Sequence, residues 1–522
     1  MKTAHVVILI VLTFIVFGCV SLYLGQDDEA DTRGYHSYIA WAWLNDQTFQ
    51  DIAVDYWASY YNPIPEMPWY LLQHWTNSAR VTAFIIGGIH GLLALGIGLL
   101  AYWVGGKDIF LGVLCFVCFV FSPSYIHALG TQGHDIEAAI LFLFSLFLIL
   151  KYSTIKAFCI SGFIAGLAFG CKLTGIIFIV GFYVVIIYGF IHSKNRTEII
   201  KQIIAWTAGV LVGFVIVQGY WSYVLWVNTG NPIFPLYNHI FSSPFAEHST
   251  FVVDKWKPKS IADVLLMPYY MATKSWWTDT QYGLFSSLYI ALVLSWVFLA
   301  YKNIKHKCNE TFSINSLFLF SMSSFVAWAV LYGQARYLLL TDGVTAVVAL
   351  SSVSMVTNRY RRIAMVAVVT IILVSSGWYY LFRVDFNNGR VFSDVVVPSS
   401  SDPNKTVVFL ADNRHLSFLV PEFDKDITFI GLWSTGITSF VHPEYGSLLS
   451  KKITSIIEDS TISKYAMFCI EREPFASENM ELWGLKLDQT SPFVMVEQRY
   501  DRYTKYRDPF HVVISPVERL TK

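Results

Sequence analysis

Residues 5–24 read HVVILIVLTFIVFGCVSLYL, and residues 25–36 continue as GQDDEADTRGYH. As a helix, the first run is long enough to cross the roughly 30 Å of hydrocarbon in a bilayer. The second run begins with the carboxylates of Asp27, Asp28, Glu29 and Asp31. An apolar helix that ends in a cluster of acids predicts a membrane span followed by a solvated loop.

A cleaved signal peptide is an alternative interpretation of the first run, because Val16-Phe17-Gly18-Cys19 resembles a lipoprotein cleavage box. Phe17 is bulky where such boxes have a small residue, and the apolar run continues without a break to Leu24. We therefore expect an uncleaved first helix. Both interpretations place the acidic loop outside the cytoplasm.

The composition of the whole chain also indicates a protein that is embedded in a membrane. Of its residues, 55% are hydrophobic, 17% are aromatic and only 14% are charged, which is far from the average of soluble domains. The formal net charge is zero, so no basic surface suggests a nucleic-acid partner, and membrane lipids are the expected surroundings. The seven cysteines lie mostly in apolar runs and show neither a disulfide framework nor zinc-ligand spacing.

Further apolar runs of near-spanning length follow along the chain. Together with residues 5–24 they predict about eleven transmembrane helices, at 81–104, 109–126, 136–150, 157–170, 173–191, 203–227, 284–300, 313–331, 338–356 and 363–381. The fifth run is short and meets the sixth at Cys171-Lys172-Leu173-Thr174. That junction also fits a broken or re-entrant hairpin.

Lysine and arginine concentrate in alternate short loops, which face the cytoplasm by the positive-inside rule. These loops contain Lys2, Lys107, Lys151, Lys156, Lys194, Arg196, Lys201, Lys302, Lys305, Lys307, Arg359, Arg361 and Arg362. The predicted topology has a cytoplasmic N-terminus. The loops at 25–80 and 228–283, and everything after Phe382, are then extracytoplasmic.

The C-terminal region has a different pattern. Residues 405–411, 426–432, 465–470 and 510–515 are predicted as strands and 445–459 as a helix, and Pro398–Pro403 reads as a turn-rich linker. The predicted fold class is a polytopic all-α membrane domain with a C-terminal soluble α/β domain. We place the membrane domain at 1–382 and the extracytoplasmic α/β domain at 383–522.

The acidic loop is the first candidate site. Asp27 and Glu29 fit a solvated helix end, but Asp31 is followed by Tyr35 and His36 and then by further aromatic residues. A carboxylate lined with rings and hydrogen-bond donors is the mixture that sugar-binding clefts need. Each ring taken singly also fits an ordinary interfacial belt, so only the density of the cluster favours a site.

Two cations and a second polar cluster lie near predicted span ends. Arg336 is placed to bind a phosphate bidentately, and Lys172 lies between two apolar runs where an unpaired ammonium is costly. Snorkelling to the interface is the structural alternative for both. His134, Asp135 and Glu137 open another span; they could bind phosphate or metal, or simply cap the helix against its dipole. His90 and Asp342 lie within spans, and a local contact between Asp342 and Arg336 would explain Asp342 structurally.

These residues resemble the GT-C superfamily of membrane glycosyltransferases, which use polyprenyl-phosphate-linked sugars as donors. That family places an essential aspartate in the first outer loop, and Asp31 in Asp31-Thr-Arg-Gly-Tyr35-His36 matches it best, with Asp28 second. The segments Gly170-Cys-Lys-Leu-Thr-Gly175 and Gly230-Asn-Pro-Ile-Phe-Pro-Leu-Tyr-Asn238 resemble elements of a poorly characterised bacterial branch. A Pro-rich turn alone also explains the second segment. The same loop, with Trp276, Trp277 and Asp279, could form the wall that binds the acceptor.

The resemblance implies an enzyme of the bacterial inner membrane, of hexosyltransferase type, that moves a sugar from a polyprenyl phosphate to a periplasmic glycan, lipid or protein acceptor by an inverting single displacement. It implies Asp31, with Asp28, as catalytic residues, and a second acidic site that Asp135 and Glu137 match. Arg336 and Lys172 would bind the donor phosphate, and Tyr35, His36 and His134 the substrate. We expect no cofactor; the pattern leaves a divalent metal open but gives it no support. A polysaccharide polymerase or ligase and a lipid-sugar flippase are the rival functions, although no internal repeat typical of transporters is present.

Overall fold

The computed structural model describes residues 3–193, 195–249, 256–273, 286–305, 312–355, 360–376, 381–386, 400–432, 441–488, 493–497 and 510–520. Lys2, Lys194, Lys307, Arg359, Trp276, Trp277, Asp279 and the Pro398 end of the predicted linker lie outside these residues. The chain forms two compact units. The helical unit contains Met1–Tyr23, Phe84–Gln218 and Asp254–Leu381, and the sheet unit contains Leu24–Ala83, Gly219–Val253 and Phe382–Lys522.

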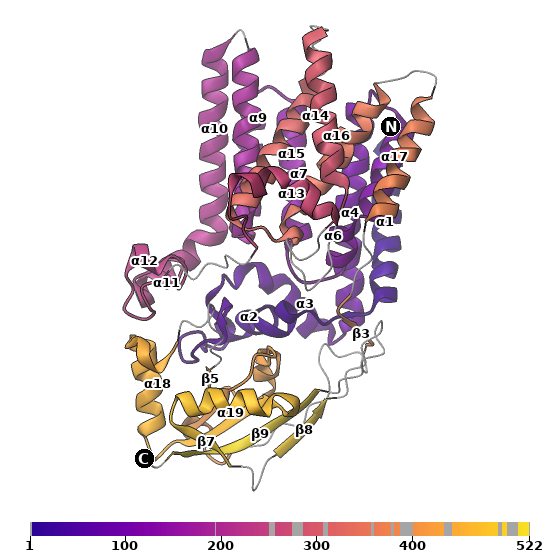
Figure 1. The fold of residues 1–522 in the computed structure, drawn as a ribbon. Helices are drawn as coiled ribbons and strands as arrows, with labels where there is room; N and C mark the ends of the chain where they lie inside the picture. Colours follow the sequence, from indigo (N-terminus) through magenta and orange to yellow (C-terminus); the bar gives the residue numbers. More distant parts are fainter. Residues whose placement is uncertain are drawn as a thin grey trace. The chain divides into compact units, whose positions relative to one another are not determined.

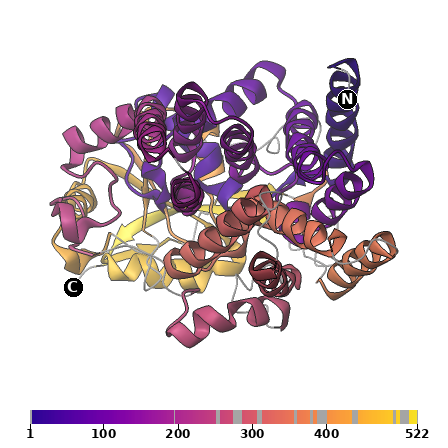
Figure 2. The same ribbon diagram turned by 90° about the horizontal axis from the view of Figure 1, so that it is seen from above.

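Long apolar helices build the helical unit (Figure 1). They are α1 (Thr3–Leu24), α4 (Ala79–Val104), α5 (Ile109–Val120), α6 (Pro123–Ala128), α7 (Asp135–Lys151), α8 (Ile155–Cys171), α9 (Ile176–His192), α10 (Arg196–Phe214), α13 (Ile261–Thr273), α14 (Leu288–Lys305), α15 (Phe312–Leu331), α16 (Leu339–Ser354) and α17 (Arg361–Ser375). Several are seen nearly end-on in Figure 2, so they run roughly parallel to one another, as spans of one bilayer would.

Each apolar run predicted as a span contains a helix, but the run 109–126 is interrupted at Phe121 and Ser122, between α5 and α6. Six helices in the described residues are long and apolar enough to cross a membrane, namely Ala4–Leu24, Ala79–Val104, Leu173–His192, Arg196–Thr229, Phe312–Leu331 and Ala335–Ser354, with shorter apolar helices beside them. The prediction of a polytopic helical membrane domain is therefore confirmed, whereas the count of eleven stays a prediction. At the junction near Lys172, α8 ends at Cys171, a short 3-10 turn covers Leu173–Gly175, and α9 begins at Ile176.

Glycines allow the helices α8 and α10 to pack against each other through their backbones. A Cβ at Gly162 or Gly166 of α8 would lie about 2 Å from the backbone oxygens of Trp206 or Val210 on α10, at 2.0 and 2.2 Å. Gly213 of α10 makes the same close approach from the other helix, because a Cβ there would lie 2.2 Å from the carbonyl oxygen of Phe163. Small residues four apart let two helices touch through their backbones, which drives packing in lipid where the hydrophobic effect is weak.

A mixed sheet forms the centre of the sheet unit. Its strands are β4 (Thr406–Leu410), β5 (Thr428–Gly431), β6 (Ser463–Cys469), β7 (Leu485–Leu487), β8 (Phe493–Glu497) and β9 (Phe510–Arg519), in the order β5-β4-β6-β9-β7 with β8 also paired to β9. Strand β4 is parallel to β5 and β6, and β9 is antiparallel to β6. The helices α18 (Leu448–Glu458) and α19 (Glu473–Leu482) complete this region (Figure 1). Four predicted strands and the predicted helix are confirmed; α19, β7 and β8 were not predicted.

The acidic loop after α1 is part of this same folded unit. Its elements are β1 (Gln26–Asp27), a π-helical turn at Thr32–His36, α2 (Ser37–Leu44), β2 (Val54–Trp57) and α3 (Met67–Thr76). Ile52 forms a parallel bridge to Ile430 at the edge of β5, and β1 pairs with β3 (Arg383–Val384). The helices α11 (Tyr220–Thr229) and α12 (Asn238–Phe241) from the second large loop also belong to this unit.

The core of the sheet unit explains this grouping. Strand residues alternate between two faces, and Val408 and Leu410 of β4 pack in one cluster with Tyr38 and Trp41 of α2. On the other face, Val407 and Phe409 share a cluster with Trp221 of α11 and Ile453 of α18. The loops thus cover apolar sheet surface that would otherwise be exposed. The domain boundary expected at 382/383 stays a prediction.

Candidate functional site

The acids that follow α1 have different roles in the sheet unit. Asp27 is buried, accepts hydrogen bonds from Thr32 Oγ1 at 2.6 Å and from the Glu29 amide at 3.1 Å, and so holds the turn that follows it. Asp28 Oδ1 lies 3.8 Å from Arg33 Nε. Asp31 directly precedes the π-helical turn, but its side chain makes no capping hydrogen bond to it. Asp31 is half-buried, so its carboxylate is held by the fold without being used to cap a helix.

A buried Asp–His pair lies in the same unit and was not predicted from the sequence. His415 Nδ1 and Asp55 Oδ1 lie 2.7 Å apart, and the Asp55 side chain is only 2% exposed. Gly34 packs directly on this carboxylate, because a Cβ there would lie 2.3 Å from Asp55 Oδ2. Burial alone would lower the pKa of His415, but the carboxylate of Asp55, helped by Asp31, raises it overall, while Arg33 opposes the rise.

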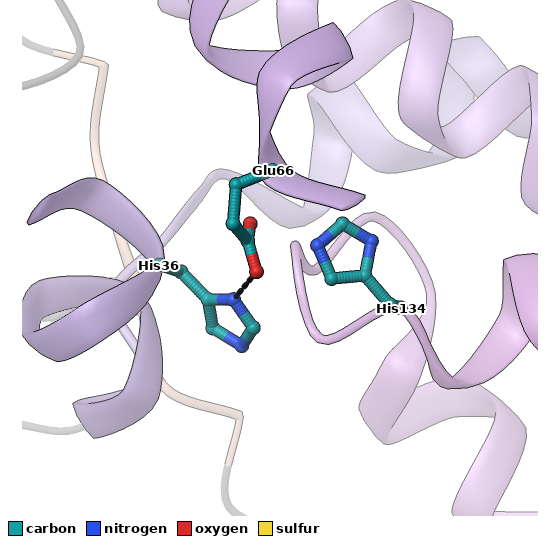
Figure 3. A group of neighbouring side chains, drawn as sticks. All are labelled: His36, Glu66 and His134. Atoms are coloured by element: carbon teal, nitrogen blue, oxygen red, sulfur yellow. Dashed lines mark hydrogen bonds and ion pairs between the residues drawn. The ribbon is translucent and has the colours of Figure 1, made fainter. Parts of the chain in front are cut away.

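His36 and Tyr35, predicted to bind substrate, have well-defined neighbours. His36 Nδ1 lies 2.6 Å from Glu66 Oε1, and both side chains are almost fully buried (Figure 3). The ring of Tyr35 contacts the rings of His36 and Tyr61, with centroids 4.0 and 5.2 Å apart. The His36–Glu66 pair therefore fixes the turn before α2 against the turn before α3. Glu66 carried no signal in the sequence beyond its place among prolines.

In the helical unit, the predicted acids at the start of α7 separate toward different partners. His134 precedes the helix in a left-handed conformation with φ of 57°, and Figure 3 draws it on that turn. Asp135 Oδ1 lies 2.9 Å from Lys172 Nζ. Glu137 Oε1 lies 3.3 Å from His90 Nε2. Since His90 Nδ1 accepts a hydrogen bond from the Gly130 amide at 2.9 Å, its proton is on Nε2 and faces Glu137.

Lys172 and Arg336, the two cations proposed from the sequence, meet at one narrow pocket of the helical unit. Asp135 and Tyr337 also line this pocket, which continues among apolar residues of α7, α9 and α16. Lys172 Nζ lies 5.7 Å from the centre of the Tyr337 ring, and Arg336 Cζ lies 5.3 Å from it. Lys172 also donates to the carbonyl oxygen of Gly133. Lys172 is therefore paired with protein groups, and simple snorkelling does not describe it.

The charges of this pocket favour an anion. Two cations and one carboxylate leave a net positive charge, and the aromatic face of Tyr337 stabilises both cations. A guanidinium beside an ammonium is the arrangement that recognises phosphate oxygens well. Asp342, which was considered as a local partner for Arg336, accepts a hydrogen bond from Tyr289 of α14.

The second large loop is held by its own side chains. Asn231 Nδ2 donates to the Leu236 carbonyl at 3.0 Å, and Asn231 Oδ1 accepts from the Ile233 amide at 3.0 Å. Asn238 donates to the carbonyl oxygens of Ser243, Ala246 and Glu247. These bonds explain both Asn231 and Asn238 of the Gly230–Asn238 segment structurally.

Comparison with known proteins gives a fold and no sequence family. No protein-family model and no curated protein matches the chain. The crystal structure of ArnT from Cupriavidus metallidurans bound to undecaprenyl phosphate matches with a TM-score of 0.53 at 11% identity, over 99% of this chain and 98% of that chain. The apo form of ArnT gives a TM-score of 0.48 at 11% identity over the same shares of the two chains. This chain is therefore a multi-pass membrane protein with an ArnT-like fold.

Proposed function

We propose that this protein is an integral membrane glycosyltransferase that moves a sugar from a polyprenyl-phosphate donor to a periplasmic glycan, lipid or protein acceptor. The observation that carries the proposal is the pocket where Lys172 and Arg336 lie over the ring of Tyr337 beside Asp135. Two cations at the ends of membrane helices suit a phosphate that is anchored to a lipid. The ArnT structure of similar fold holds undecaprenyl phosphate, which supports the same class of ligand here.

The donor phosphate is the leaving group in this reaction. The bond between the anomeric carbon and the phosphate oxygen breaks, and its electron pair leaves with the polyprenyl phosphate. Arg336 and Lys172 would stabilise the charge that develops on those oxygens, which is commonly among the largest contributions to catalysis. Asp135 holds Lys172 at 2.9 Å and so keeps its ammonium in place between turnovers.

The acceptor supplies the nucleophile. Its hydroxyl oxygen forms the new bond to the anomeric carbon from the face opposite the phosphate, which inverts the configuration. Asp31 would take the hydroxyl proton as general base, with Asp28 as the second candidate. The half-buried Asp31 carboxylate, which does not cap the following turn, supports this role better than Asp27, whose oxygens bind Thr32 and the Glu29 amide.

The charge distribution supports a proposed location. Lys151 ends α7 and Lys156 lies at the start of α8, so both lie at the opposite helix ends from Asp135 and Lys172. By the positive-inside rule the lysine-rich ends face the cytoplasm. We propose that the protein lies in a bacterial inner membrane with its N-terminus in the cytoplasm and its sheet unit in the periplasm.

Transfer from radiolabelled polyprenyl-phosphate sugars tests the function, with membranes that contain the protein and extracts as acceptor. We expect Asp31→Asn to lower transfer by about 10²–10⁴-fold, as loss of a general base does. Arg336→Ala and Lys172→Ala should lower it by about 10²-fold or more. The matched controls are Asp46→Asn, which changes an exposed aspartate of the same loop, and Lys156→Ala, which changes an exposed lysine.

Other outcomes identify the rivals. If no donor gives transfer with the wild-type protein, while labelled lipid-sugar crosses the bilayer only in its presence, the protein is a flippase. If whole lipid-linked oligosaccharides are joined, it is a polymerase or ligase. Full wild-type transfer by Asp31→Asn would exclude Asp31 as the base.

A further inference from the structure

His415 and Asp55 lie where α/β sheets usually build their binding sites. His415 follows β4, which ends at Leu410, and Asp55 follows the Ile52 bridge that runs parallel to β5. Both residues therefore lie beyond the carboxyl ends of the parallel strands. Strand β4 has β5 on one side and β6 on the other. The connection from β4 to β5 and the connection from β5 to β6 therefore run in opposite directions across the sheet, which makes β4 a strand of a topological switch point. Ligands of open α/β sheets bind at such switch points.

The contacts of the pair show that the imidazole is oriented. Whether neutral or charged, the ring donates its Nδ1–H to Asp55 Oδ1 at 2.7 Å. This bond orients the imidazole so that Nε2 points away from Asp55. Asp55 is itself held by the close packing of Gly34 and by its buried position. A histidine that a buried carboxylate orients in this way is a common element of catalytic centres.

The charges around His415 connect it with the predicted base. Asp55 of β2, and Asp31 and Arg33 of the π-helical turn region, are the charged groups whose fields act on the imidazole. Ser417 Oγ donates to the Arg33 carbonyl oxygen at 3.4 Å, and Gly34 packs on Asp55. The segment after β4 therefore lies against the turn that Asp31 precedes. In this position Asp31 raises the pKa of His415, although less than Asp55 does. Electrostatic coupling is reciprocal, so a protonated His415 must favour the ionised form of Asp31 to the same extent.

We propose that His415, oriented by Asp55, is a positioning residue for Asp31: its imidazolium keeps the Asp31 carboxylate ionised and ready to accept the proton of the acceptor hydroxyl. The role rests on the function proposed above. It assigns a role in catalysis to the C-terminal region, because the segment after β4 supplies the histidine that Asp55 orients. The transfer reaction should then require Asp31 deprotonated and His415 protonated.

The first readout is the pH dependence of transfer by the full chain. His415→Asn removes the charge, and asparagine tolerates the left-handed backbone at this position, where φ is 52°. We expect kcat to fall about tenfold or more with little change in the KM for donor. The acidic limb of the profile should move to higher pH, because Asp31 loses its stabilising cation. His415→Lys should restore part of the rate, and His248→Gln, at an exposed histidine of the same unit, should match the wild type.

The second readout needs no turnover. Diethyl pyrocarbonate modifies neutral imidazole, so the modification of His415 against pH, followed by mass spectrometry of the full chain, reports its titration. We expect the midpoint to fall strongly in Asp55→Asn and less in Asp31→Asn, with no change in Asp46→Asn. Suppose that the wild-type protein transfers sugar, that the pH profile of His415→Asn equals that of the wild type, and that the His415 midpoint is unchanged in Asp31→Asn. This result overturns the role of His415 and leaves the proposed function standing. Absence of wild-type transfer from every donor overturns the proposed function, and the role of His415 with it, even where the titration shows coupling.

Discussion

Asp51 is a buried carboxyl group in the sheet unit whose titration gives a testable pH effect. Tyr38 donates to its Oδ2 at 2.7 Å and the Phe429 amide to its Oδ1 at 2.7 Å. Burial raises the pKa of Asp51 from 3.8 to about 7, although both hydrogen bonds act in the opposite direction. The folded state therefore binds this proton more tightly than the unfolded state. Its contribution to stability is present below about pH 4 and is lost as pH rises toward about 7.

Asp51→Asn removes this dependence while keeping an oxygen that can accept from the Phe429 amide. We expect the apparent Tm of the variant, relative to the wild type, to rise as pH increases from about 4 to 7, by an amount that corresponds to a few kcal/mol. Thermal unfolding of the full chain in detergent at a series of pH values measures it. Asp46→Asn is the control, and a Tm difference that stays constant over this range would contradict the assignment.

At this same scale, single residues were predictable where their chemistry conflicts with their surroundings. Lys172 stood out because an ammonium between apolar runs needs a partner, and Asp135 is that partner. Asp55 and His415 carried no comparable signal. They are separated by 360 positions along the chain, and neither sits in an apolar run, so only the folded structure brings them together.

At the scale of elements, periodicity and the length of apolar runs were enough to predict most helices, as well as the strands β4, β5 and β6. The short elements after α1 were not predictable in detail, because their order comes from packing on the sheet and not from local propensity. Trp41 of α2, for example, is buried in a cluster with Leu410 of β4.

The α8–α10 pair gives a prediction about elements. Gly166→Ala would place a Cβ 2.2 Å from the Val210 carbonyl oxygen, and two backbones cannot yield without separating the helices. We expect a loss of about 1–3 kcal/mol, as for overpacked cores, seen as a lower Tm and less monodisperse protein in detergent. Gly189→Ala in α9 is the matched control, since its nearest atom is 4.0 Å away. There alanine should be neutral or stabilising by up to about 1 kcal/mol. Equal stability of the two variants would refute the close packing.

At the scale of the whole molecule, charge distribution and hydropathy predicted a membrane protein with a C-terminal α/β region, and the ArnT-like fold agrees. They did not predict which loops join that region. The Ile52 bridge to Ile430 and the shared cores depend on contacts between distant segments, for which a single sequence holds no local signal. The sheet unit is consequently assembled from three separate stretches of chain.

A disulfide tests this assembly in the intact protein. Gln50 Nε2 lies 3.3 Å from Thr428 Oγ1, and the parallel register of Ile52 with Ile430 makes the two positions neighbours across the sheet edge. Gln50→Cys with Thr428→Cys should therefore form a disulfide under mild oxidation, detected by mass spectrometry of linked peptides. Gln50→Cys with Lys486→Cys is the control, because Lys486 lies in β7 at the opposite edge of the sheet. Oxidation of both pairs to the same extent would indicate random encounter. A link specific to the first pair means that the segment around Gln50 and Ile52 of the acidic loop is an edge segment of the sheet.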